Sequence, residues 1–576
     1  MIDDYRFLND LNAKQKEICQ SNGNYILTAC PGSGKTRTIT YRLAYLQQKY
    51  KSSRKFLIAI TYTNRAAEEI EKRLDDMGID LSCIWTGTIH QFCMHFIIRP
   101  YAMYSPKLSK GYRIIDEYVK LQYCQEIATE LGITLGFEDP ITDQRICTRY
   151  KSKLEQEKEI DFDQILELSF ELLKNNQFIS ENIAEIIRCI HIDEYQDTKE
   201  LQYLILAEII KANTAINLLF VGDANQAIYG TLGSVAKNAE QLRAMYPITF
   251  CEDMLNGCYR STQRLVDYYA QFEVHTTNAV AVSGHREVPG IIKYSQTVGV
   301  NHLAEAIAEI ILERLAQGIP EREICIAAPQ WYMLYPISKE LQRLLPMVHF
   351  DSPDITPFKY DRMNPFYLLA QLTFTKAGTR VSSRKRTARE LIEILLSDYG
   401  VMIPEQIDAY SILRVINESV DPNKEGIDCL STVISRLFKY LHISSANEAA
   451  LGETCSTFLT KARQRIDKYN LPHTYSDLAN SFKERDGIVI STIHGTKGEE
   501  YDTVIAYGLL KGYVPNWSVI INQSHIAQSE ERKLLYVLCS RAKTNLYLFS
   551  ETGRYTKKGN QYTSCEALQQ ACCDYD

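Results

Sequence analysis

The chain has 576 residues and a mass of 66.1 kDa, which is enough for several domains. Apolar residues make up 45% and charged residues 23%, as in ordinary globular proteins, and no run of about 18 apolar residues predicts a membrane span. A net charge of −7 and a pI near 6.0 argue against a protein whose whole surface wraps nucleic acid, so any nucleic acid is expected in a local groove.

The 16 cysteines stand singly, apart from Cys572-Cys573, and form no CxxC pair. This pattern favours free thiols in a reducing compartment over a disulfide framework or a zinc site. The first residues, MIDDYRF, are acidic and carry no apolar core of a signal peptide. A cytoplasmic protein with no membrane partner is therefore expected.

Near the start, residues 11–18 (LNAKQKEI) predict a short helix that carries Gln15. A carboxamide donates and accepts hydrogen bonds together, as the N6 and N7 edge of adenine requires. The alternative reading of Gln15 is an ordinary surface side chain.

A β-like run at 23–28 leads into a glycine-rich loop, and a helical pattern follows. Glycines in such a loop let successive N–H groups point at one phosphate, while a lysine supplies charge and a threonine hydroxyl can ligate Mg²⁺. The pattern predicts a nucleotide phosphate site, although its usual first glycine is an alanine here and a simple turn is the alternative. The loop residues are Ala29, Cys30, Pro31, Gly32, Ser33, Gly34, Lys35 and Thr36.

An apolar run at 186–192 ends abruptly at Asp193 and Glu194. Acids often mark the surface end of a strand or cap the next helix. A phosphate loop, however, needs a partner that holds Mg²⁺ and activates water, and ligands of open α/β sheets bind at the strand ends. Asp193 is therefore expected to hold the metal through its water shell, and Glu194 to act as the general base.

The next apolar run, 216–221, ends in GDANQAIY. At this strand tip Gln226 could sense the γ-phosphate. Tyr229 could offer its ring to a nucleic-acid base, or it could pack in the core.

Two arginines far along the chain are candidates for stabilising charge on the γ-phosphoryl group. Arg260 lies in CYRST, and Arg541 follows the helical pattern of residues 530–537. Arginines delivered from a second domain act as fingers on the transferred phosphoryl group. The alternative for each is a surface salt bridge.

Taken in order, these stretches resemble the UvrD/Rep/PcrA group of superfamily 1 DNA helicases. The resemblance runs from Gln15 to Lys543 and rests on LNAKQKEI, TACPGSGKTRTITYRLAYL, ITYTNRAAEEI, GTIHQF, IDEYQDT, VGDANQAIYG, CYRSTQRL, STIHGTKGEEYDTV and EERKLLYVLCSRAK. It implies an α/β fold with two RecA-like P-loop domains, each with a mainly helical insertion. It also implies ATP and Mg²⁺ as cofactors, single-stranded and tailed duplex DNA as partners, and 3′→5′ stepping.

The resemblance also assigns roles to residues. Gln15 would read adenine, Tyr259 would stack on it, Arg37 would lie beside the nucleotide, and Glu500 would contact ribose. Lys35, Thr36, Asp193, Glu194 and Gln226 would bind and hydrolyse Mg·ATP, with Arg260 and Arg541 as fingers. Single-strand contacts would come from Tyr62, Asn64, Thr88, His90, Tyr229, His494 and Lys497.

The alternation of strand and helix patterns predicts four domains. A first core (1A) is expected at 1–93 and 165–252, with helical insertion 1B at 94–164. A second core (2A) is expected at 253–349 and 486–576, with helical insertion 2B at 350–485, which is short for these helicases.

Three features depart from the family pattern or stand outside it. Thr231 and Leu232 replace an aromatic residue and an arginine after Tyr229, which removes a stacking platform, and Cys258 replaces an asparagine. A basic run within 2B predicts either duplex phosphate contacts or a solvated loop. Its residues are Lys376, Arg380, Arg384, Lys385, Arg386 and Arg389.

Two functions from different classes follow. The first is an autonomous ATP-dependent 3′→5′ DNA helicase or translocase. The second is an ATPase that senses DNA or nucleotide and licenses a partner nuclease. For the second, short 2B and the stretch FIIRPY (96–101) are similar to GajB-type helicases of Gabija anti-phage systems, which implies a GajA-type nuclease as partner. RNA remodelling is disfavoured by the DNA-type motifs, and a scaffold that only binds ATP is disfavoured by Glu194.

Overall fold

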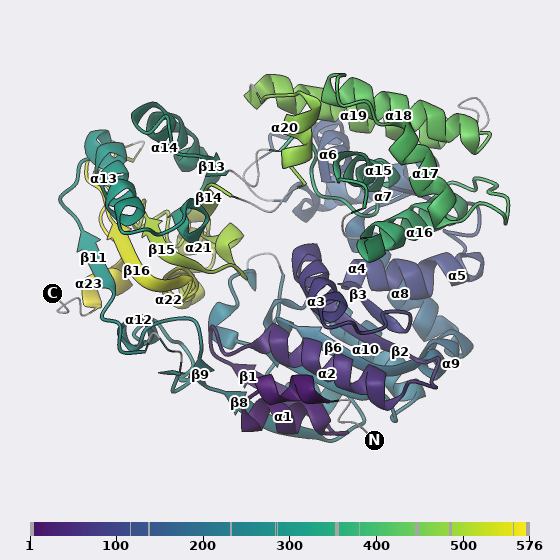
Figure 1. Cartoon of the computed structure of the whole chain (residues 1–576), viewed down its shortest axis with the longest axis horizontal. Coiled ribbons are helices and arrows are strands. Elements are labelled where there is room, and N and C mark those ends of the chain that lie inside the picture. The colour runs from purple at the N-terminus through teal and green to yellow at the C-terminus, as the bar shows by residue number, and fades with distance from the viewer. Residues whose placement is uncertain are drawn as a thin grey trace.

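The molecule contains two six-stranded parallel sheets, each covered by helices on both faces; in Figure 1 the first lies in the lower part and the second at the left. The computed structural model describes residues 5–115, 117–135, 139–230, 233–282, 284, 286–351, 356–378, 381–443, 449–469, 471–482, 486–556 and 558–571. The predicted α/β class with two parallel sheets and helical insertions is confirmed.

The first sheet has the strand order β3-β2-β6-β7-β1-β8. Successive side chains of its strands face opposite sides, so Ile26 and Ile58 enter one core while Leu27 and Leu57 enter the other. Helices α1, α2 and α3 complete the core of Leu27, and α8 to α11 complete that of Ile26. The strands are β1 (Asn24–Ala29), β2 (Phe56–Thr61), β3 (Ile84–Thr88), β6 (Ile187–Asp193), β7 (Asn217–Gly222) and β8 (Phe250–Leu255); the helices are α1 (Ala13–Gln20), α2 (Lys35–Lys49), α3 (Asn64–Asp76), α8 (Phe162–Asn175), α9 (Gln177–Ile186), α10 (Glu200–Ala212) and α11 (Ala239–Met245).

Parallel pairing places the carboxyl ends of neighbouring strands at one edge of this sheet. Strands β6, β7 and β1 are adjacent, with Ile190 opposite Leu218 and Ile26 opposite Phe220. The three segments predicted to carry the nucleotide chemistry follow these three strands. Their side chains are therefore neighbours in space although they lie far apart in the sequence.

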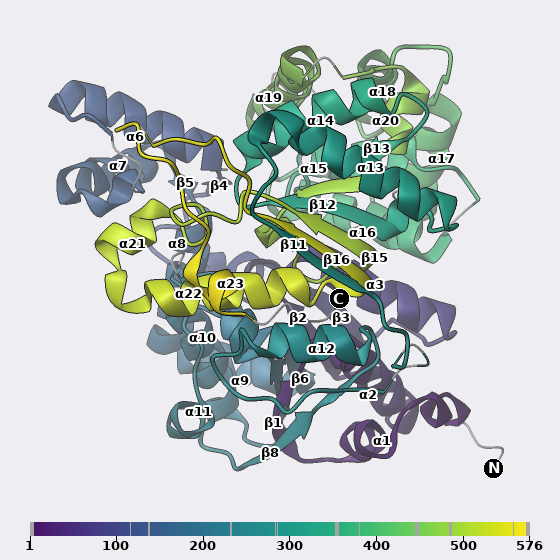
Figure 2. The ribbon, with the colours of Figure 1, turned by 90° about the vertical axis from the view of Figure 1, so that its left-hand side faces the viewer.

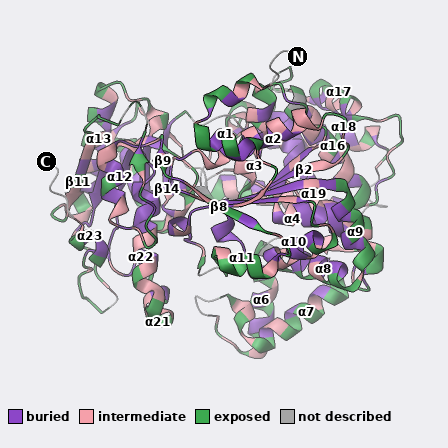
Figure 3. Ribbon diagram, turned by 90° about the horizontal axis from the view of Figure 1, so that it is seen from below, coloured by how far each residue is buried: buried purple, intermediate pink, exposed green. Residues whose placement is uncertain are grey.

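The second sheet has the order β11-β16-β15-β12-β14-β13 and is also parallel. Helices α13 and α14 cover one face, and α12, α22 and α23 cover the other (Figure 2). The strands are β11 (Ile291–Ser295), β12 (Ile324–Ala328), β13 (Phe350–Asp351), β14 (Ile488–Thr492), β15 (Tyr501–Ala506) and β16 (Ala542–Phe549); the helices are α12 (Gln263–Ala270), α13 (Leu303–Ala316), α14 (Trp331–Leu344), α21 (Trp517–Asn522), α22 (Ser524–Cys539) and α23 (Glu566–Gln570). Figure 3 shows the buried strands inside helices with exposed outer sides.

The first insertion has a small core of its own between α6 (Glu117–Leu131) and α7 (Gln144–Glu157). This core spans Ile115 to Leu154 and is closed by the two-stranded pair β4 (Arg113–Ile114) and β5 (Glu159–Ile160). The segment 94–98 that precedes it is buried in the core of the first sheet instead. The core of the insertion therefore lies inside the predicted range 94–164 and does not include the segment 94–98.

The second insertion is a helical unit built around one core from Phe358 to Leu478. The predicted start of this insertion, residue 350, lies in β13, which pairs with β14 at the edge of the second sheet. Its helices are α15 (Pro365–Phe374), α16 (Val381–Ser397), α17 (Ala409–Ser419), α18 (Gly426–Tyr440), α19 (Ala449–Tyr469) and α20 (Tyr475–Asn480).

Ion pairs join this second insertion to the first domain. Arg99 donates to both carboxylate oxygens of Asp398 at 2.8 Å, and Arg362 lies 3.1 Å from Glu68 on α3. The side chains of Arg99 and Asp398 are 11% and 10% exposed, so the pair is largely desolvated. The insertion is thus fixed to the first sheet through charges as well as through the chain connections.

The cysteines in the described ranges are free thiols, as the sequence predicts, and most of them are buried. Cys251 is an exposed exception. Within the same ranges, no helix combines the length and the apolar character that a membrane span needs.

Candidate functional site

The loop between β1 and α2 has the backbone that a phosphate-binding loop requires. Gly32 and Gly34 have φ angles of +70° and +82°, a region in which side chains are strained. Helix α2 begins at Lys35, so its free N–H groups face the end of the loop. The Gln15 carboxamide donates to the carbonyl of Ser33 at 3.0 Å and fixes the loop from the side of α1.

The loop meets the tip of β6 through two side-chain pairs. Lys35 Nζ lies 3.0 Å from Glu194 Oε1, and the Thr36 hydroxyl donates to Asp193 Oδ2 at 3.1 Å. A lysine, a threonine hydroxyl and two carboxylates are the donor set expected around Mg²⁺ and phosphate. These residues fit a bound Mg·nucleotide, and the two acids at the strand tip have the cationic neighbour that the sequence predicts.

The electrostatics of this cluster shift the pKa values of the two acids, Asp193 and Glu194, in opposite directions. Burial would raise the pKa of Glu194, but Lys35 and then Lys497 lower it below the usual range, so Glu194 is ionised. Burial and the neighbouring charge of Glu194 raise the pKa of Asp193. Burial alone would lower the pKa of Lys35, but Glu194, Asp223 and Asp193 raise it, so the lysine stays charged. Ionised Glu194 is in the state that a general base needs.

Besides Lys35, one residue that the sequence did not single out, Gln196, holds Glu194 in place. Its backbone has φ +53°, a left-handed conformation that is rare outside glycine. The Gln196 carboxamide donates to Glu194 Oε2 and accepts from the N–H of Asp223 at 3.0 Å. Gln196 thereby couples the tips of β6 and β7, and its place in the IDEYQDT stretch was the only signal for it.

An arginine of the second domain reaches the tip of β7. Arg541, which is 2% exposed, donates from Nη2 to Gln226 Oε1 at 3.0 Å. Gln226 in turn donates to Asp223 Oδ2 at 2.8 Å. Burial and then Arg260 lower the pKa of Arg541 to about 10, so it remains charged at neutral pH. The structure thus brings the two predicted residues Gln226 and Arg541 into direct contact.

The segment 258–260 lies directly on the phosphate loop. The N–H of Tyr259 donates to the carbonyl of Gly32 at 2.8 Å, and a Cβ on Gly32 would lie 2.6 Å from Cβ of Arg260. Arg260 donates from Nε to Glu500 Oε2 at 2.8 Å and from Nη1 to the carbonyl of Ser540 at 2.9 Å. Arg260 therefore lies against the loop and is bonded to Glu500 and Ser540 of the second domain.

The residues predicted to hold the adenine lie beside the loop, and each is bonded to the segment 10–12 that precedes α1. Tyr259 is 44% exposed, and its hydroxyl accepts from the Asn12 carboxamide at 2.8 Å. Gln15 is 3% exposed and completes a capping box with Asn12. Arg37 donates to the carbonyl of Asp10 at 2.9 Å. Tyr259 is the exposed side chain of this group.

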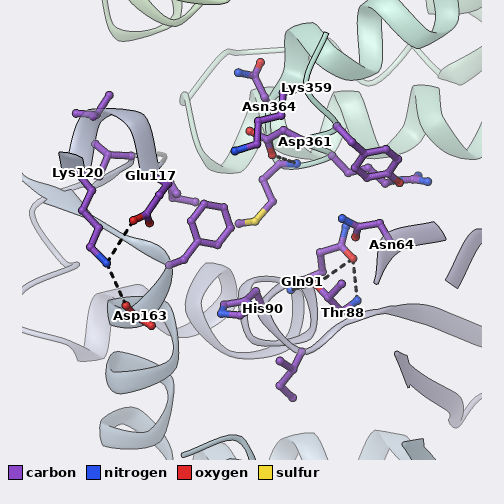
Figure 4. A pocket seen from close by; sticks show the side chains of 18 of the residues that line it. Asn64, Thr88, His90, Gln91, Glu117, Lys120, Asp163, Lys359, Asp361 and Asn364 are labelled. Carbon is purple, nitrogen blue, oxygen red and sulfur yellow. Dashed lines mark hydrogen bonds and ion pairs between the residues drawn. The ribbon is translucent and has the colours of Figure 1, made fainter. Parts of the chain in front are cut away.

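Four of the predicted nucleic-acid residues line a cavity of about 1840 Å³ between the first sheet and the two insertions (Figure 4). Tyr62 is 39% exposed there, and Asn64 has a buried Oδ1 with no hydrogen-bond partner in the described part of the chain. Thr88 caps α4 (Ile89–Phe92) through Gln91. Burial, with Lys199 beside it, lowers the pKa of His90 to about 4, so the imidazole is neutral at pH 7.

The other three residues predicted to contact nucleic acid, Tyr229, His494 and Lys497, do not line this cavity. Tyr229 is half-buried and stacks on Tyr62, with ring centroids 4.8 Å apart, and its hydroxyl donates to the His494 carbonyl at 3.4 Å. Lys497 does not reach the cavity: its ammonium bonds Asp197 and the carbonyl of Gln226. Lys497 therefore joins the second domain to the strand tips of the first. The altered positions Thr231 and Leu232 fall outside the described residues.

The residues of the basic run in the second insertion have different surroundings. Arg384 is 6% exposed, and its guanidinium donates to the carbonyls of Leu372 and Thr375 at 2.8 and 2.7 Å. Neither predicted alternative, a duplex phosphate contact or a solvated loop, holds for Arg384, because it is buried on α16 and its donors are used inside the insertion. Arg386 pairs with Glu71 of the first domain, and Arg380 lies outside the described residues.

A phosphate loop on one parallel sheet and an arginine from a second sheet define a two-domain P-loop protein. The family model described as the UvrD/REP helicase N-terminal domain matches residues 11–139 and 138–247, and that of the UvrD-like helicase C-terminal domain matches residues 459–552. The chain belongs to the UvrD/REP helicase family, whose members are DNA helicases.

Relatives that the chain resembles over most of its length are named as ATP-dependent DNA helicases. The chain is 25% identical to the ATP-dependent DNA helicase PcrA of Leuconostoc citreum, over 95% of this chain and 82% of that protein. It is 24% identical to PcrA of Bacillus subtilis, with 94% and 83% covered, and 24% identical to PcrA of Staphylococcus epidermidis, with 95% and 84% covered. The similarity is therefore distant but spans nearly the whole chain.

Proposed function

We propose that the protein is an ATP-driven DNA helicase that steps 3′→5′ along single-stranded DNA. The contact between Arg541 of the second domain and Gln226 of the first carries this proposal, because it joins the strand tips of the nucleotide site to an element that moves with the other domain. The polarity is inferred from the family resemblance.

The chain's own groups divide the work of hydrolysis. Glu194, ionised and held by Gln196, accepts the proton of the attacking water. Lys35 moves from its pair with Glu194 to the phosphates of ATP, and Arg260 and Arg541 balance charge on the γ-phosphoryl oxygens. Mg²⁺, held by Thr36 and by Asp193 through water, would neutralise phosphate charge when bound.

The effect of losing the γ-phosphate would be transmitted to the second domain through the contacts of Gln226. Its carboxamide bonds Arg541, and its carbonyl bonds Lys497, so two side chains of the second domain depend on one residue of the first. A shift of Gln226 would change both contacts, which is how hydrolysis would alter the relative position of the domains. Such a change between domains is the step that moves a bound strand.

Strand displacement from tailed duplexes tests the proposal. The wild-type protein should release the labelled strand from a 3′-tailed duplex with ATP and Mg²⁺, and it should leave a 5′-tailed duplex intact. Glu194→Gln should bind the same DNA but lose displacement, since removal of a general base costs about 10²–10⁴ in rate. Equal displacement of both duplexes, or activity that survives in Glu194→Gln, would contradict the proposal.

A second candidate is an ATPase that licenses a partner nuclease. The ion pairs Arg99–Asp398 and Arg362–Glu68 favour it, because an insertion fixed to the first domain resists the motion that unwinding demands. DNA-stimulated ATP hydrolysis without displacement on any tailed duplex, and displacement only with a co-purified nuclease, would support this candidate over the first.

A further inference from the structure

Three residues predicted to hold the base are bonded to one short segment, residues 10–12, which precedes α1. Arg37 of α2 donates to a backbone carbonyl of this segment at 2.9 Å. The N–H of Asn12 donates to the Gln15 carboxamide at 3.2 Å, and the Asn12 side chain donates to the Tyr259 hydroxyl at 2.8 Å. Two of these bonds are therefore made by Asn12, a residue outside the predicted base contacts.

The two ends of the Asn12 carboxamide have different partners. Its Oδ1 caps α1 by accepting from the N–H of Gln15 at 2.8 Å, while its Nδ2 donates to the hydroxyl of Tyr259. A backbone N–H can only donate, so the cap decides which end of the carboxamide is the oxygen. The nitrogen is thereby turned toward Tyr259, and the tyrosine hydroxyl is held as the acceptor.

Tyr259 is held both through its backbone and through the far end of its side chain. Its N–H donates to the carbonyl of Gly32 in the phosphate loop at 2.8 Å, and its hydroxyl is bonded to Asn12. The residue is nevertheless 44% exposed, and no other aromatic ring of the described residues stacks on it. The ring is therefore fixed beside the phosphate loop while part of its surface stays open to a ligand.

These bonds form a closed circuit with the phosphate loop. The Gln15 carboxamide donates to the carbonyl of Ser33 at 3.0 Å, and Ser33 follows Gly32 directly in the chain. The circuit runs through Gly32, Tyr259, Asn12, Gln15 and Ser33. Tyr259 lies between β9 (Gly257–Cys258) and α12, so the circuit ties the start of the second domain to α1 and to the loop.

Helix α11 of the first domain has the same cap as α1 but without the additional bond. Asn238 accepts from the N–H of Gln241 at 2.9 Å, and its own N–H donates to the Gln241 carboxamide at 2.9 Å. Within the described part of the chain, Nδ2 of Asn238 has no hydrogen-bond partner. A capping box therefore forms without a contact of the kind that Asn12 makes with Tyr259, and that contact needs another explanation.

We propose that Asn12 is a positioning residue that holds the Tyr259 ring in place for stacking on the base of the nucleotide. The inference rests on the proposed ATP-driven function. Because the ring is ordered before the nucleotide arrives, less of its rotational freedom is lost on binding. Loss of the bond should therefore weaken binding through the base, and it should leave both binding through the phosphates and the chemical step unchanged.

Nucleotide binding and hydrolysis by three variants test this role. Asn12→Ser keeps an oxygen that caps α1, but its shorter side chain should not reach the Tyr259 hydroxyl; Tyr259→Phe keeps the ring and removes the hydroxyl. We expect each variant to weaken ADP binding and to raise the KM for ATP about fivefold, with kcat close to that of the wild type. The double variant Asn12→Ser/Tyr259→Phe should show the same fivefold change, because both substitutions remove one and the same bond.

Two further variants and a ligand without a base provide the controls. Asn12→Asp also caps α1, and its carboxylate can accept from the Tyr259 hydroxyl, so it should bind ADP more tightly than Asn12→Ser. Asn238→Ser changes the matching cap of α11, on the opposite face of the first sheet, and should bind ADP as the wild type does. Inorganic tripolyphosphate should inhibit ATP hydrolysis by the wild type and by Asn12→Ser with the same inhibition constant.

Three results would overturn the role of Asn12 alone, provided that the wild-type protein hydrolyses ATP. The first is an Asn12→Ser variant with the wild-type KM and ADP affinity. The second is a double variant whose loss is the product of the two single losses, roughly 25-fold. The third is an equal weakening of ADP and tripolyphosphate, which would trace the effect to the phosphate loop instead of the ring. A wild-type protein that neither binds nor hydrolyses ATP would overturn the proposed function together with this inference.

Discussion

Glu194 combines strain with function at a single residue. A left-handed φ costs a non-glycine residue about 1–2 kcal/mol, yet β6 ends in this conformation and turns the carboxylate toward Lys35. Gln196 and Lys35 hold the side chain there. The strain at the strand tip thus coincides with the residue to which the hydrolytic role is assigned.

Gly32 gives a prediction about contact between the domains. Gly32→Ala should strain the backbone and also drive Cβ into Arg260, so ATP hydrolysis should fall at least tenfold while the protein still folds. Gly78→Ala is the control, because Gly78 has φ +69° and nothing within 4 Å of a new Cβ. Both variants strain the backbone, but only Gly32→Ala clashes with Arg260. Comparing ATP hydrolysis and thermal melting of the two variants therefore separates the effect of the clash from that of the strain. A Gly32→Ala enzyme as active as Gly78→Ala would contradict the close approach of Arg260.

His90 gives a prediction about pH. Its pKa of about 4 in the folded protein lies below the ordinary 6.5, because burial and Lys199 oppose the charge, while Asp163 partly offsets them. The unfolded state therefore binds more protons between these two pH values, and the free energy of unfolding should rise with pH across that window. His90→Gln should flatten this rise in urea titrations. An unchanged pH dependence in the variant would show that His90 is not buried as a neutral ring.

Arg99 and Asp398 carry a prediction at the level of packed elements. Arg99→Met should leave the carboxylate of Asp398 buried without its partner, at a cost of about 3–5 kcal/mol, and should loosen α16 from the first domain. The double variant Arg99→Met/Asp398→Leu should recover most of that loss. Thermal melting and hydrogen exchange of α16 measure both effects. A double variant as unstable as the single one would argue against a charge-based attachment of the insertion.

The elements that the sequence predicted well are local ones. The phosphate loop, the acids after β6 and Gln226 after β7 each depend on a strand followed by a turn, which short patterns encode. The ion pairs that attach the second insertion to the first domain could not be predicted from short local patterns. Arg99 and Asp398 are separated by 299 residues, and no periodicity marks either as a partner of the other.

Lys497 illustrates the same limit within the site. The motif that contains Lys497 predicted a contact with single-stranded DNA. In the structure the Lys497 ammonium lies against Asp197, 300 residues away in the sequence. The side chain of Asp197 is fully buried, so the pairing depends on how the second domain approaches the first. Tertiary packing therefore makes Lys497 a link between the domains, which its motif alone does not reveal.

For the whole molecule, the proposed nucleotide site lies between the two sheets, and the large cavity lies between the first sheet and the two insertions. The site depends on both sheets, because Arg260, Arg541 and Lys497 come from the second and the phosphate loop comes from the first. The cavity lies on the side of Tyr62, and Tyr229 connects it to the strand tips. DNA in the cavity and nucleotide in the site would therefore act on the same few contacts between domains.

Steady-state ATP hydrolysis with and without single-stranded DNA tests this coupling in wild type and in Arg541→Lys. We expect strong stimulation by DNA in the wild type. In the variant we expect a rate about 10³-fold lower, with nucleotide binding retained, since a finger arginine contributes about 10³–10⁵. Hydrolysis that ignores DNA, or an Arg541→Lys enzyme that hydrolyses ATP at the wild-type rate, would contradict a motor that works through contact between its two domains.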